Sequence, residues 1–208
     1  MRAVSRQVGI WAPPGQQPGE GVVALAAEAG ALGGARALAR FAADATVGYA
    51  HGGRHDLWWE FQLSASFRWQ AHVNRMNPAF ARQRTARLTG LFGLTELLNR
   101  RVETLDAGEL ARANLAVALL PQPDLLVWEE PFRTLPGSEW MQLCRTVRRL
   151  CRTDGLTVIM VAEENPDAAA KEEATDDWLY QTGSDHSGDR RRAWAPRGRF
   201  AATGTVWP

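Results

Sequence analysis

The stretch TLDAGELARANLAVALLPQPDLLVWEEPFRTLP, residues 104–136, decides how the rest of the chain is interpreted. Asp106, followed three residues later by Glu109, is typical of a capped helix start, because side-chain oxygens accept hydrogen bonds from the free backbone N–H groups there. Apolar residues then recur at helical spacing as far as Leu120, and Pro121 ends the pattern. We therefore expect a helix with one apolar face.

A short apolar run, LLVW at residues 125–128, follows this helix and predicts a buried strand of a parallel sheet. Two acids, Glu129 and Glu130, stand where that strand ends. Ligands of open α/β sheets bind at the carboxyl ends of the strands, so these acids are candidates for a site. Solvated acids at a strand end would give the same pattern.

The order of these features resembles that of the ATP-binding subunits of ABC transporters. Residues 104–109 look like their signature motif, Leu-Ser-Gly-Gly-Gln. Residues 118–124 match the usual link to the Walker B strand, and residues 125–131 are similar to Walker B itself, four apolar residues followed by Asp-Glu-Pro. Any α/β domain can contain a capped helix, a loop and a buried strand, but several short motifs in this order favour the family.

The resemblance implies an α/β fold of the P-loop NTPase-like type, an ABC nucleotide-binding domain with a mostly parallel sheet. We expect one domain over residues 1–208, with an inserted helical subdomain at about 62–103. A chain of 208 residues can bury an adequate core. Because it begins only a few residues before the expected phosphate loop, we expect it to be truncated at the N-terminus and to lack the family's early strands.

Composition narrows the function classes. A net charge of +1 gives no argument for nucleic acid or for an anionic membrane surface. The two cysteines, Cys144 and Cys151, have the wrong spacing for a metal knuckle, and we expect buried structural thiols. Basic residues are spread over the helical stretch between Gln62 and Arg101, where a solvated helix surface is the favoured interpretation: Arg82, Arg84, Arg87 and Arg100.

The first 31 residues have the layout of a phosphate-binding loop. An apolar strand at 8–11 precedes a Pro- and Gly-rich stretch at 12–20, and an apolar helical stretch follows at 22–31. Backbone N–H groups in such a loop, together with the helix N-terminus, cradle phosphates. A surface turn would explain the loop's composition equally well, but its position in the chain favours a relic P-loop.

Compared with the family's Gly-Pro-Asn-Gly-Ala-Gly-Lys-Ser-Thr, this loop keeps Pro13 and Gly15 but loses the groups that bind phosphate and metal. Pro18 falls at the lysine, Gly19 at the Mg²⁺-binding hydroxyl, and Glu20 at the next residue. Proline removes both the cation and a backbone donor. The chain has one lysine, Lys171, which lies in an acidic, Ala-rich stretch, so no lysine of this chain can serve the loop.

Residues 51–60, HGGRHDLWWE, look like the Q-loop region of daunorubicin-type exporter ATPases. On this match Gly53 replaces the glutamine that senses Mg²⁺ and the γ-phosphate. Trp58 and Trp59 would lie near the coupling helix of the membrane subunit. Histidines 51 and 55 could suggest a metal site, but no Cys or third His accompanies them, which favours solvated loop histidines.

The resemblance assigns roles to a few further residues. Glu129 would bind Mg²⁺, and Glu130 would polarise the attacking water as the catalytic residue. Gly15 and Gly19 of the loop would contact nucleotide, together with Asp106, Gly108 and Glu109 of the signature.

Several of the family's catalytic groups are replaced. Asp106 replaces the signature serine, Pro136 replaces the D-loop aspartate, and Glu163 stands where the family has a histidine. Two like charges about 4 Å apart cost on the order of 4 kcal/mol at an effective dielectric near 20, so Asp106 would repel a γ-phosphate. We therefore expect a degenerate site, with Glu130 vestigial.

These residues predict a degenerate ABC-type nucleotide-binding subunit of an exporter. It would be cytoplasmic and held on the inner face of the membrane by an ABC permease, paired with an intact ABC ATPase or with a second copy. Its cofactors, if any, would be ATP and Mg²⁺. Two alternatives remain: an active ATP-hydrolysing transporter subunit, and a soluble interaction protein that kept the fold. We expect no nucleic-acid partner.

The missing loop lysine predicts that the purified protein has no measurable ATPase activity and gains little thermal stability from millimolar MgATP. Bound ligand stabilises a protein by RT ln(1 + [L]/Kd), so a weak site produces almost no shift. Coupled ATPase assays and thermal unfolding with and without MgATP measure both quantities. Turnover that Glu130→Gln abolishes would contradict the degenerate site.

Overall fold

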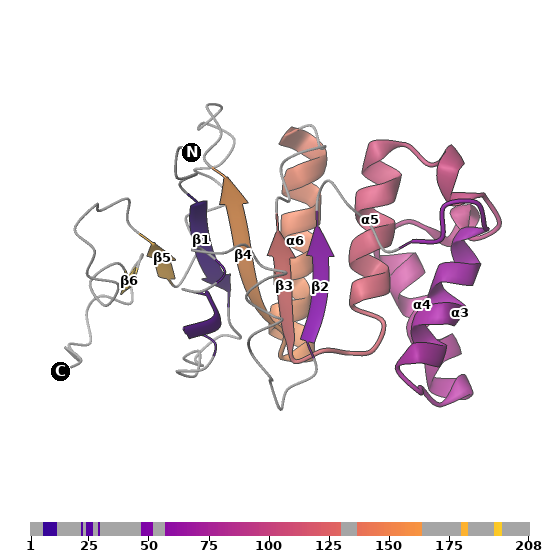
Figure 1. Cartoon of the computed structure of the whole chain (residues 1–208), viewed down its shortest axis with the longest axis horizontal. Helices are drawn as coiled ribbons and strands as arrows, with labels where there is room; N and C mark the ends of the chain where they lie inside the picture. Colours follow the sequence, from indigo (N-terminus) through magenta and orange to yellow (C-terminus); the bar gives the residue numbers. More distant parts are fainter. Residues whose placement is uncertain are drawn as a thin grey trace.

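Figure 1 shows the computed structural model, which describes residues 6–11, 22, 24–26, 29, 47–51, 57–129, 137–163, 180–182 and 194–196. The strands in this part of the chain are β1 Arg6–Trp11, β2 Val47–His51, β3 Leu125–Glu129, β4 Thr157–Glu163, β5 Tyr180–Thr182 and β6 Trp194–Pro196. The helices with defined bounds are α3 Leu63–Val73, α4 Pro78–Leu91, α5 Ala107–Ala118 and α6 Gly137–Asp154, with 3-10 turns at η1 Thr95–Leu97 and η2 Val102–Thr104. The described residues between 22 and 29 are helical as well.

The strands form one sheet in the order β2-β3-β4-β1-β5-β6. Strands β2, β3 and β4 are parallel, and the register sets Glu129 of β3 between His51 of β2 and Val161 of β4. The carboxyl ends of these three strands therefore share one edge of the sheet, where the tips of their arrows point the same way (Figure 1).

Strand β1 runs in the opposite direction. It pairs antiparallel with β4, with Arg6 opposite Glu163 and Trp11 opposite Val158. Trp11 thus lies three residues, or about 10 Å along the strands, from the row that contains Glu129. The strand expected at residues 8–11 is present, but it ends toward the edge opposite the carboxyl ends of β3 and β4.

The direction of β1 does not suit the relic P-loop that the sequence suggested. A phosphate-binding loop in an open α/β sheet follows a parallel strand and leaves from the carboxyl edge. Residues 12–20, with Gly15 and Gly19, lie outside the described residues. The Pro/Gly composition of this stretch could not distinguish the two directions, because turns of either kind favour the same residues.

Side-chain alternation along β3 divides the core into two layers. Leu125 and Val127 pack with Val8 and Ile10 of β1 on one face of the sheet. Leu126 and Trp128 point to the other face, in the same cluster as the buried residues of α5 and α6. The rings of Trp128 and Trp140 lie there at a centroid distance of 5.0 Å, which ties β3 to α6.

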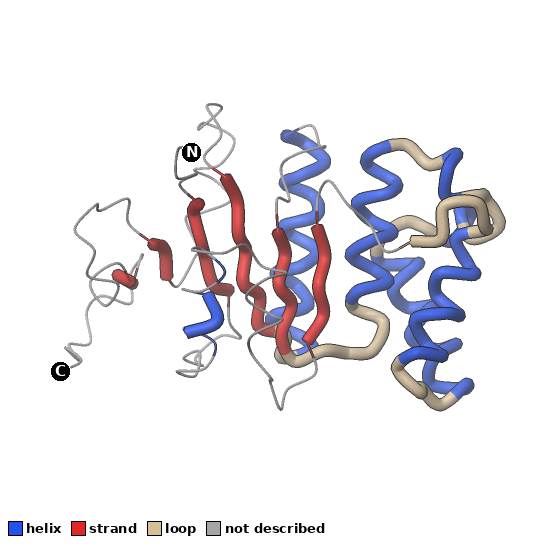
Figure 2. The backbone as a smooth tube through the Cα atoms, viewed as in Figure 1, coloured by secondary structure: helices blue, strands red, loops and turns tan. Residues whose placement is uncertain are grey.

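Helices α3, α4 and α5 stand beside the β2 edge of the sheet (Figure 2). Asn77 caps α4 by accepting a hydrogen bond from the N–H of Ala79 at 2.9 Å, and Pro78 occupies its first turn. Helix α3 ends in a Schellman motif, in which the N–H of Met76 donates to the carbonyl of Ala71. Pro78 therefore begins the second of two separate helices.

The left-handed position of this Schellman motif carries a side chain. Arg75 has φ 50°, a conformation that glycine adopts without steric cost and that L-residues rarely adopt. The equivalent position after α4 is Gly93, with φ 64°. The turn between α3 and α4 thus retains an arginine where a glycine would be less strained.

The Arg84 guanidinium holds α4 against the core. Its side chain is 8% exposed; Nη2 donates to the carbonyl of Leu119 at 2.8 Å, and Nη1 lies 3.5 Å from Asp154 Oδ2. Arg87 donates to both carboxylate oxygens of Asp154 at 2.6 Å. The solvated helix surface expected for these arginines is therefore wrong for Arg84, because the ends of two other helices supply acceptors that spacing within α4 could not reveal. Arg87 is exposed as expected, and it also pairs with Asp154.

Most of the other predicted elements agree with the structure. The capped helix after residue 104 and the strand at 125–128 are present as α5 and β3. Residues 95–104 form two 3-10 turns rather than a continuation of the helix, and β6 was not predicted. Cys144 and Cys151 are free and buried as expected, and burial raises the pKa of the Cys151 thiol to about 12.

Within the described residues, no helix combines the length and apolarity needed to cross a bilayer. The helix α6 is amphipathic, with Leu143, Val147 and Leu150 on its buried side and Arg145 and Arg149 exposed.

The pKa of Asp154 predicts an acid-sensitive contribution to stability. Hydrogen bonds from Arg87 lower this pKa to about 2, below the ordinary value near 3.9, so the contribution is present above pH 4 and is lost as the pH falls toward 2. We expect it to be about 1–2 kcal/mol, because the partner Arg87 is exposed to solvent.

Chemical denaturation of wild type and Asp154→Asn between pH 5 and pH 2.5 measures this contribution. The free energy of unfolding of wild type should fall by about 1–2 kcal/mol more than that of the variant. Glu103→Gln, which removes an exposed pair with Arg101, should leave the pH dependence nearly unchanged. Parallel curves for wild type and Asp154→Asn would contradict the prediction.

Candidate nucleotide site

The N-terminus of α5 carries the residues that match the signature motif. Asp106 and Glu109 form a reciprocal capping box: the N–H of Glu109 donates to Asp106 Oδ1 at 2.7 Å, and the N–H of Asp106 donates to Glu109 Oε2 at 2.9 Å. The cap predicted from sequence is therefore confirmed. These two hydrogen bonds occupy backbone N–H groups that would otherwise be free to donate to a phosphate at the helix N-terminus.

Arg100 approaches the same helix end from the preceding turn. Its Nη1 donates to Glu109 Oε1 at 3.0 Å, and its Nη2 donates to the carbonyl of Thr104. Both oxygens of the Glu109 carboxylate thus have partners, because Oε2 accepts from the N–H of Asp106 and Oε1 accepts from Arg100. Arg100 is exposed, as the sequence suggested, and in addition it pairs with the capping residue Glu109.

Glu139 of α6 places a third carboxylate at this helix end. A Cβ atom added at Gly108 would lie 2.0 Å from Glu139 Oε2, so the carboxylate rests directly against the bare backbone of Gly108. Gly108 is buried in the first turn of α5. A carboxylate in this place is stabilised by the positive end of the helix dipole.

Three acids therefore surround the N-terminus of α5: Asp106, Glu109 and Glu139. Asp106 stands where the sequence comparison expected a serine hydroxyl, and the Glu139 carboxylate lies against Gly108. Like charges about 4 Å apart cost on the order of 4 kcal/mol at an effective dielectric near 20. The arrangement stabilises an empty helix end and disfavours a polyphosphate there.

Helix α5 is connected by a short link, residues 119–124, to β3 and therefore runs antiparallel to it, so its N-terminus faces the carboxyl edge of β2, β3 and β4 (Figure 1). Asn114 of α5 donates to the carbonyl of His51 at the end of β2 at 3.1 Å. The signature match and Glu129 thus lie toward the same end of the domain. They lie on different faces of the sheet. Glu129 shares the face of Leu125 and Val127, because side chains alternate along a strand, whereas α5 packs on the face of Leu126 and Trp128.

Glu129 is buried, at 8% exposure, and ends β3. The hydroxyl of Tyr49 on the neighbouring strand β2 donates to Glu129 Oε2 at 2.7 Å. One carboxylate oxygen of the residue expected to bind Mg²⁺ is therefore held by a phenol. Glu129 sits at the strand end where Walker B acids are expected, with a protein group bound to it.

Other expected site residues cannot be placed beside Glu129. Glu130 and Gly53 lie outside the described residues, as do Gly15, Gly19 and Pro136. Of the described His, Cys, Asp and Glu residues, no three lie close enough together to hold a metal ion. Within this part of the chain the structure brings together Asp106, Gly108 and Glu109, and adds two residues the sequence did not single out, Tyr49 and Glu139.

An exposed aromatic surface lies beside α3. Trp58 contacts Phe61 and Trp69 with ring centroids 5.2 and 5.0 Å apart. Trp59 is 49% exposed and Phe61 is 54% exposed, which is unusual for side chains of this size. The Trp pair is thus available to a partner, as a docking role would require.

The chain is similar in sequence to import ATP-binding proteins of ABC transporters. It is 39% identical over 87 residues to the phosphonates import ATP-binding protein PhnC 2 of Rhodopseudomonas palustris, which covers 42% of this chain and 31% of that protein. It is 33% identical over 88 residues to the thiamine import ATP-binding protein ThiQ of Haemophilus ducreyi, covering 42% of this chain and 41% of that one. Each matched segment spans less than half of the relative. No protein-family model matches the chain.

Solved structures identify the class of fold. An ATP-binding cassette of an ABC transporter in its ADP conformation aligns with TM-score 0.50 and 14% identity over 63% of this chain and 55% of that one. CbiO1 from Clostridium perfringens, part of an ABC transporter complex, aligns with TM-score 0.50 and 20% identity over 60% and 49%. The expected fold is confirmed: this is an α/β fold of the P-loop NTPase type, as in ABC ATP-binding domains. The named sequence relatives are importers, whereas the sequence motifs suggested an exporter.

The contact of Glu139 with Gly108 predicts strong coupling between these positions. Gly108→Ala should destabilise the protein by about 1 kcal/mol, because the new methyl group displaces the carboxylate. In a Glu139→Ala background the same change should be neutral or stabilising, since alanine is the better helix former. Urea unfolding of the four proteins gives the coupling energy, and additive effects would contradict the contact.

Proposed function

We propose that the chain is a degenerate ABC-type nucleotide-binding subunit that contributes assembly or regulation to a transporter rather than ATP turnover. The observation that carries the proposal is the crowding of carboxylates at the N-terminus of α5, where the capping box and Glu139 take the place of phosphate-binding donors. The single lysine, far from the phosphate loop in sequence, supports it.

In a pair of such subunits, ATP would lie between the phosphate loop of one and the signature helix of the other. This chain's α5 would present Asp106 and Glu109 to the partner's nucleotide, and its own loop would lack a lysine. Both composite sites would be weakened, one by repulsion and the other by the missing cation. The partner would be an intact ATPase, or a second copy of this chain, with ATP and Mg²⁺ bound chiefly by the partner's residues.

We further propose that the chain docks on an ABC permease through Trp58 and Trp59 and the helices at about 62–103. Large exposed aromatic side chains supply much of the buried area in protein interfaces. On this view the chain forms one ABC-ATPase-like domain on the inner face of the membrane, where the permease holds it. The LWWE segment at 57–60 supports a daunorubicin-type exporter, although the named relatives are importers.

The active-ATPase alternative has one supporting observation. Glu129 is buried at the end of β3, where a Mg²⁺-binding acid of this fold would stand. Its bond with Tyr49 would have to open for metal to bind both oxygens. Because the arrangement at α5 disfavours phosphate, we rank this alternative second.

Co-purification with a candidate ABC permease tests the proposal. Changing Trp58 and Trp59 to Ala should reduce recovery of the permease about tenfold or more, because each buried aromatic anchor contributes strongly to binding. Glu130→Gln should leave recovery unchanged. Assembly that depends on Glu130 and is indifferent to both tryptophans would overturn the scaffold role and favour the enzyme.

A further inference from the structure

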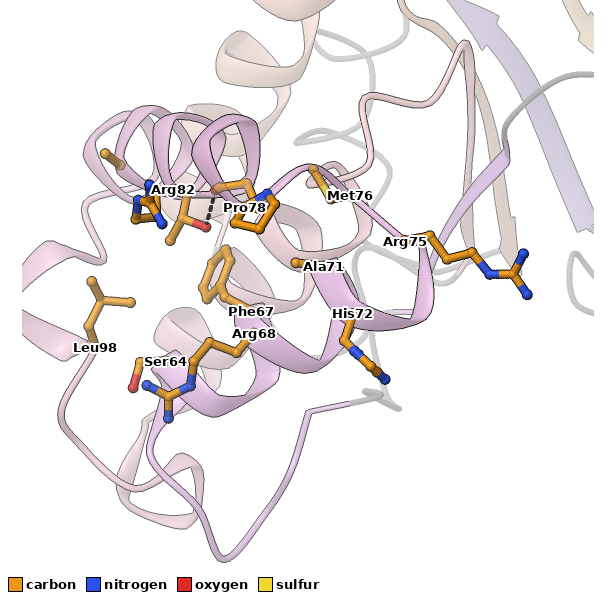
Figure 3. Close-up of a pocket in the computed structure, with 13 residues that line it drawn as sticks. Ser64, Phe67, Arg68, Ala71, His72, Arg75, Met76, Pro78, Arg82 and Leu98 are labelled. Carbon is orange, nitrogen blue, oxygen red and sulfur yellow. Dashed lines mark hydrogen bonds between the residues drawn. The ribbon is translucent and has the colours of Figure 1, made fainter.

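A pocket of about 370 Å³ lies where the end of α4 meets α5 and the first three turns of α6. It differs from the larger groove between α3 and α4 (Figure 3), whose described lining residues include three arginines and no acid. Among the described residues that line the smaller pocket, two carry a charge, Arg112 of α5 and Glu139 of α6. The pocket therefore offers one cationic and one anionic group to a ligand.

The guanidinium of Arg112 has no partner within the described part of the chain. Its Nε is buried and donates to no acceptor, and the side chain forms none of the ion pairs found for other arginines of the helices. Burying a polar group without a hydrogen-bond partner is costly, so buried donors are nearly always paired with protein, water or ligand. Because Arg112 lines a pocket, a bound group with acceptor oxygens could supply the missing partner.

The carboxylate of Glu139 is the second charged group of this pocket. It rests against Gly108, which precedes Arg112 by one helical turn, or about 6 Å, on the same face of α5. Glu139 and Arg112 are both half-buried and line the same space, yet they form no ion pair with each other. The pocket thus holds opposite charges close together without neutralising them.

The end of α4 adds partial negative charge to the pocket. Residues 91–93 line it, and α4 ends there in a Schellman motif, in which the N–H of Leu94 donates to the carbonyl of Thr89 at 2.7 Å. The last carbonyl groups of a helix favour a nearby cation. Glu139 and this helix end therefore favour an ammonium group, whereas Arg112 favours a carboxylate.

We propose that this pocket binds a free α-amino acid with an uncharged side chain. The carboxylate of the amino acid would pair with Arg112, and its ammonium group would pair with Glu139. A simple anion would be repelled by Glu139 and a simple cation by Arg112, whereas a zwitterion satisfies both. The ligand's side chain would meet uncharged lining residues, among them the buried Phe92 and Leu143. A volume of about 370 Å³ is in the range of small-molecule sites.

Glycine, L-serine, L-glutamine, L-leucine and L-phenylalanine are the probes, because they share the zwitterionic group and differ in side-chain size. Ligand-observed NMR and isothermal titration calorimetry with the full chain should give a dissociation constant between about 10 μM and 1 mM for at least one of them. The N-acetyl and the amide derivative of the tightest binder each lack one charge. Each derivative should bind wild type at least about tenfold more weakly than the parent amino acid.

Two variants separate the charges of the pocket. Arg112→Gln and Glu139→Gln should each weaken binding of the amino acid at least about tenfold, because each removes one charged partner. The derivatives should respond in the opposite direction: the cationic amide should bind Arg112→Gln more tightly than wild type, and the anionic N-acetyl derivative should bind Glu139→Gln more tightly. Arg149→Gln and Glu103→Gln, at exposed positions outside the pocket, should leave binding within about twofold. Thermal unfolding confirms that each variant is folded.

Several outcomes would overturn the proposal. Absence of binding by all five amino acids is one, and binding that neither pocket variant weakens is another. If no amino acid binds while a double-mutant cycle of Arg112→Gln and Glu139→Gln shows coupled stabilities, the two side chains pair with each other in solution instead. The assay contains neither nucleotide nor permease, so its failure would leave the proposed transporter role standing.

Discussion

The buried guanidinium of Arg84 connects α4 to the ends of α5 and α6. It joins α4 to the carbonyl end of α5 through Leu119 and, with Arg87, to Asp154 at the end of α6. Negative partial charge accumulates at the C-termini of both helices, and an acid at the end of α6 would add to it. The paired arginines offset that charge. This cluster adds polar contacts to the hydrophobic core that packs the helical hairpin against α5 and the sheet.

With that hairpin fixed, α5 is held between α4 and the sheet, and its N-terminus points to the carboxyl edge of the strands. Its three carboxylates, the Arg100 pair and the bare Gly108 form a helix end that is satisfied by the chain itself. Local stability and nucleotide binding require different partners for the N–H groups at this helix end. A backbone N–H that already donates to a capping carboxylate is not free to donate to a phosphate.

The sequence predicted local structure well, and long-range partners poorly. The capping box of Asp106 and Glu109 could be predicted because both residues lie within one helical turn. The strand at 125–128 could be predicted because burial on both faces of a sheet leaves a continuous apolar stretch in the sequence. Glu139 against Gly108, Tyr49 on Glu129 and Asp154 beside Arg84 each join residues distant in the chain. The direction of β1 likewise could not be predicted, because side chains alternate between the two faces in the same way in parallel and antiparallel strands.

The placement of β1 also bears on how the chain folds. Residues 6–11 precede the other strands in the chain, yet they lie in the sheet between β4 and β5, whose residues come after position 156. Contacts between such distant segments close a large loop, which slows folding. During synthesis β1 therefore has no pairing partner until β4, about 150 residues further along the chain, has been made. Helices α3 to α5, whose contacts are closer in sequence, can assemble well before it.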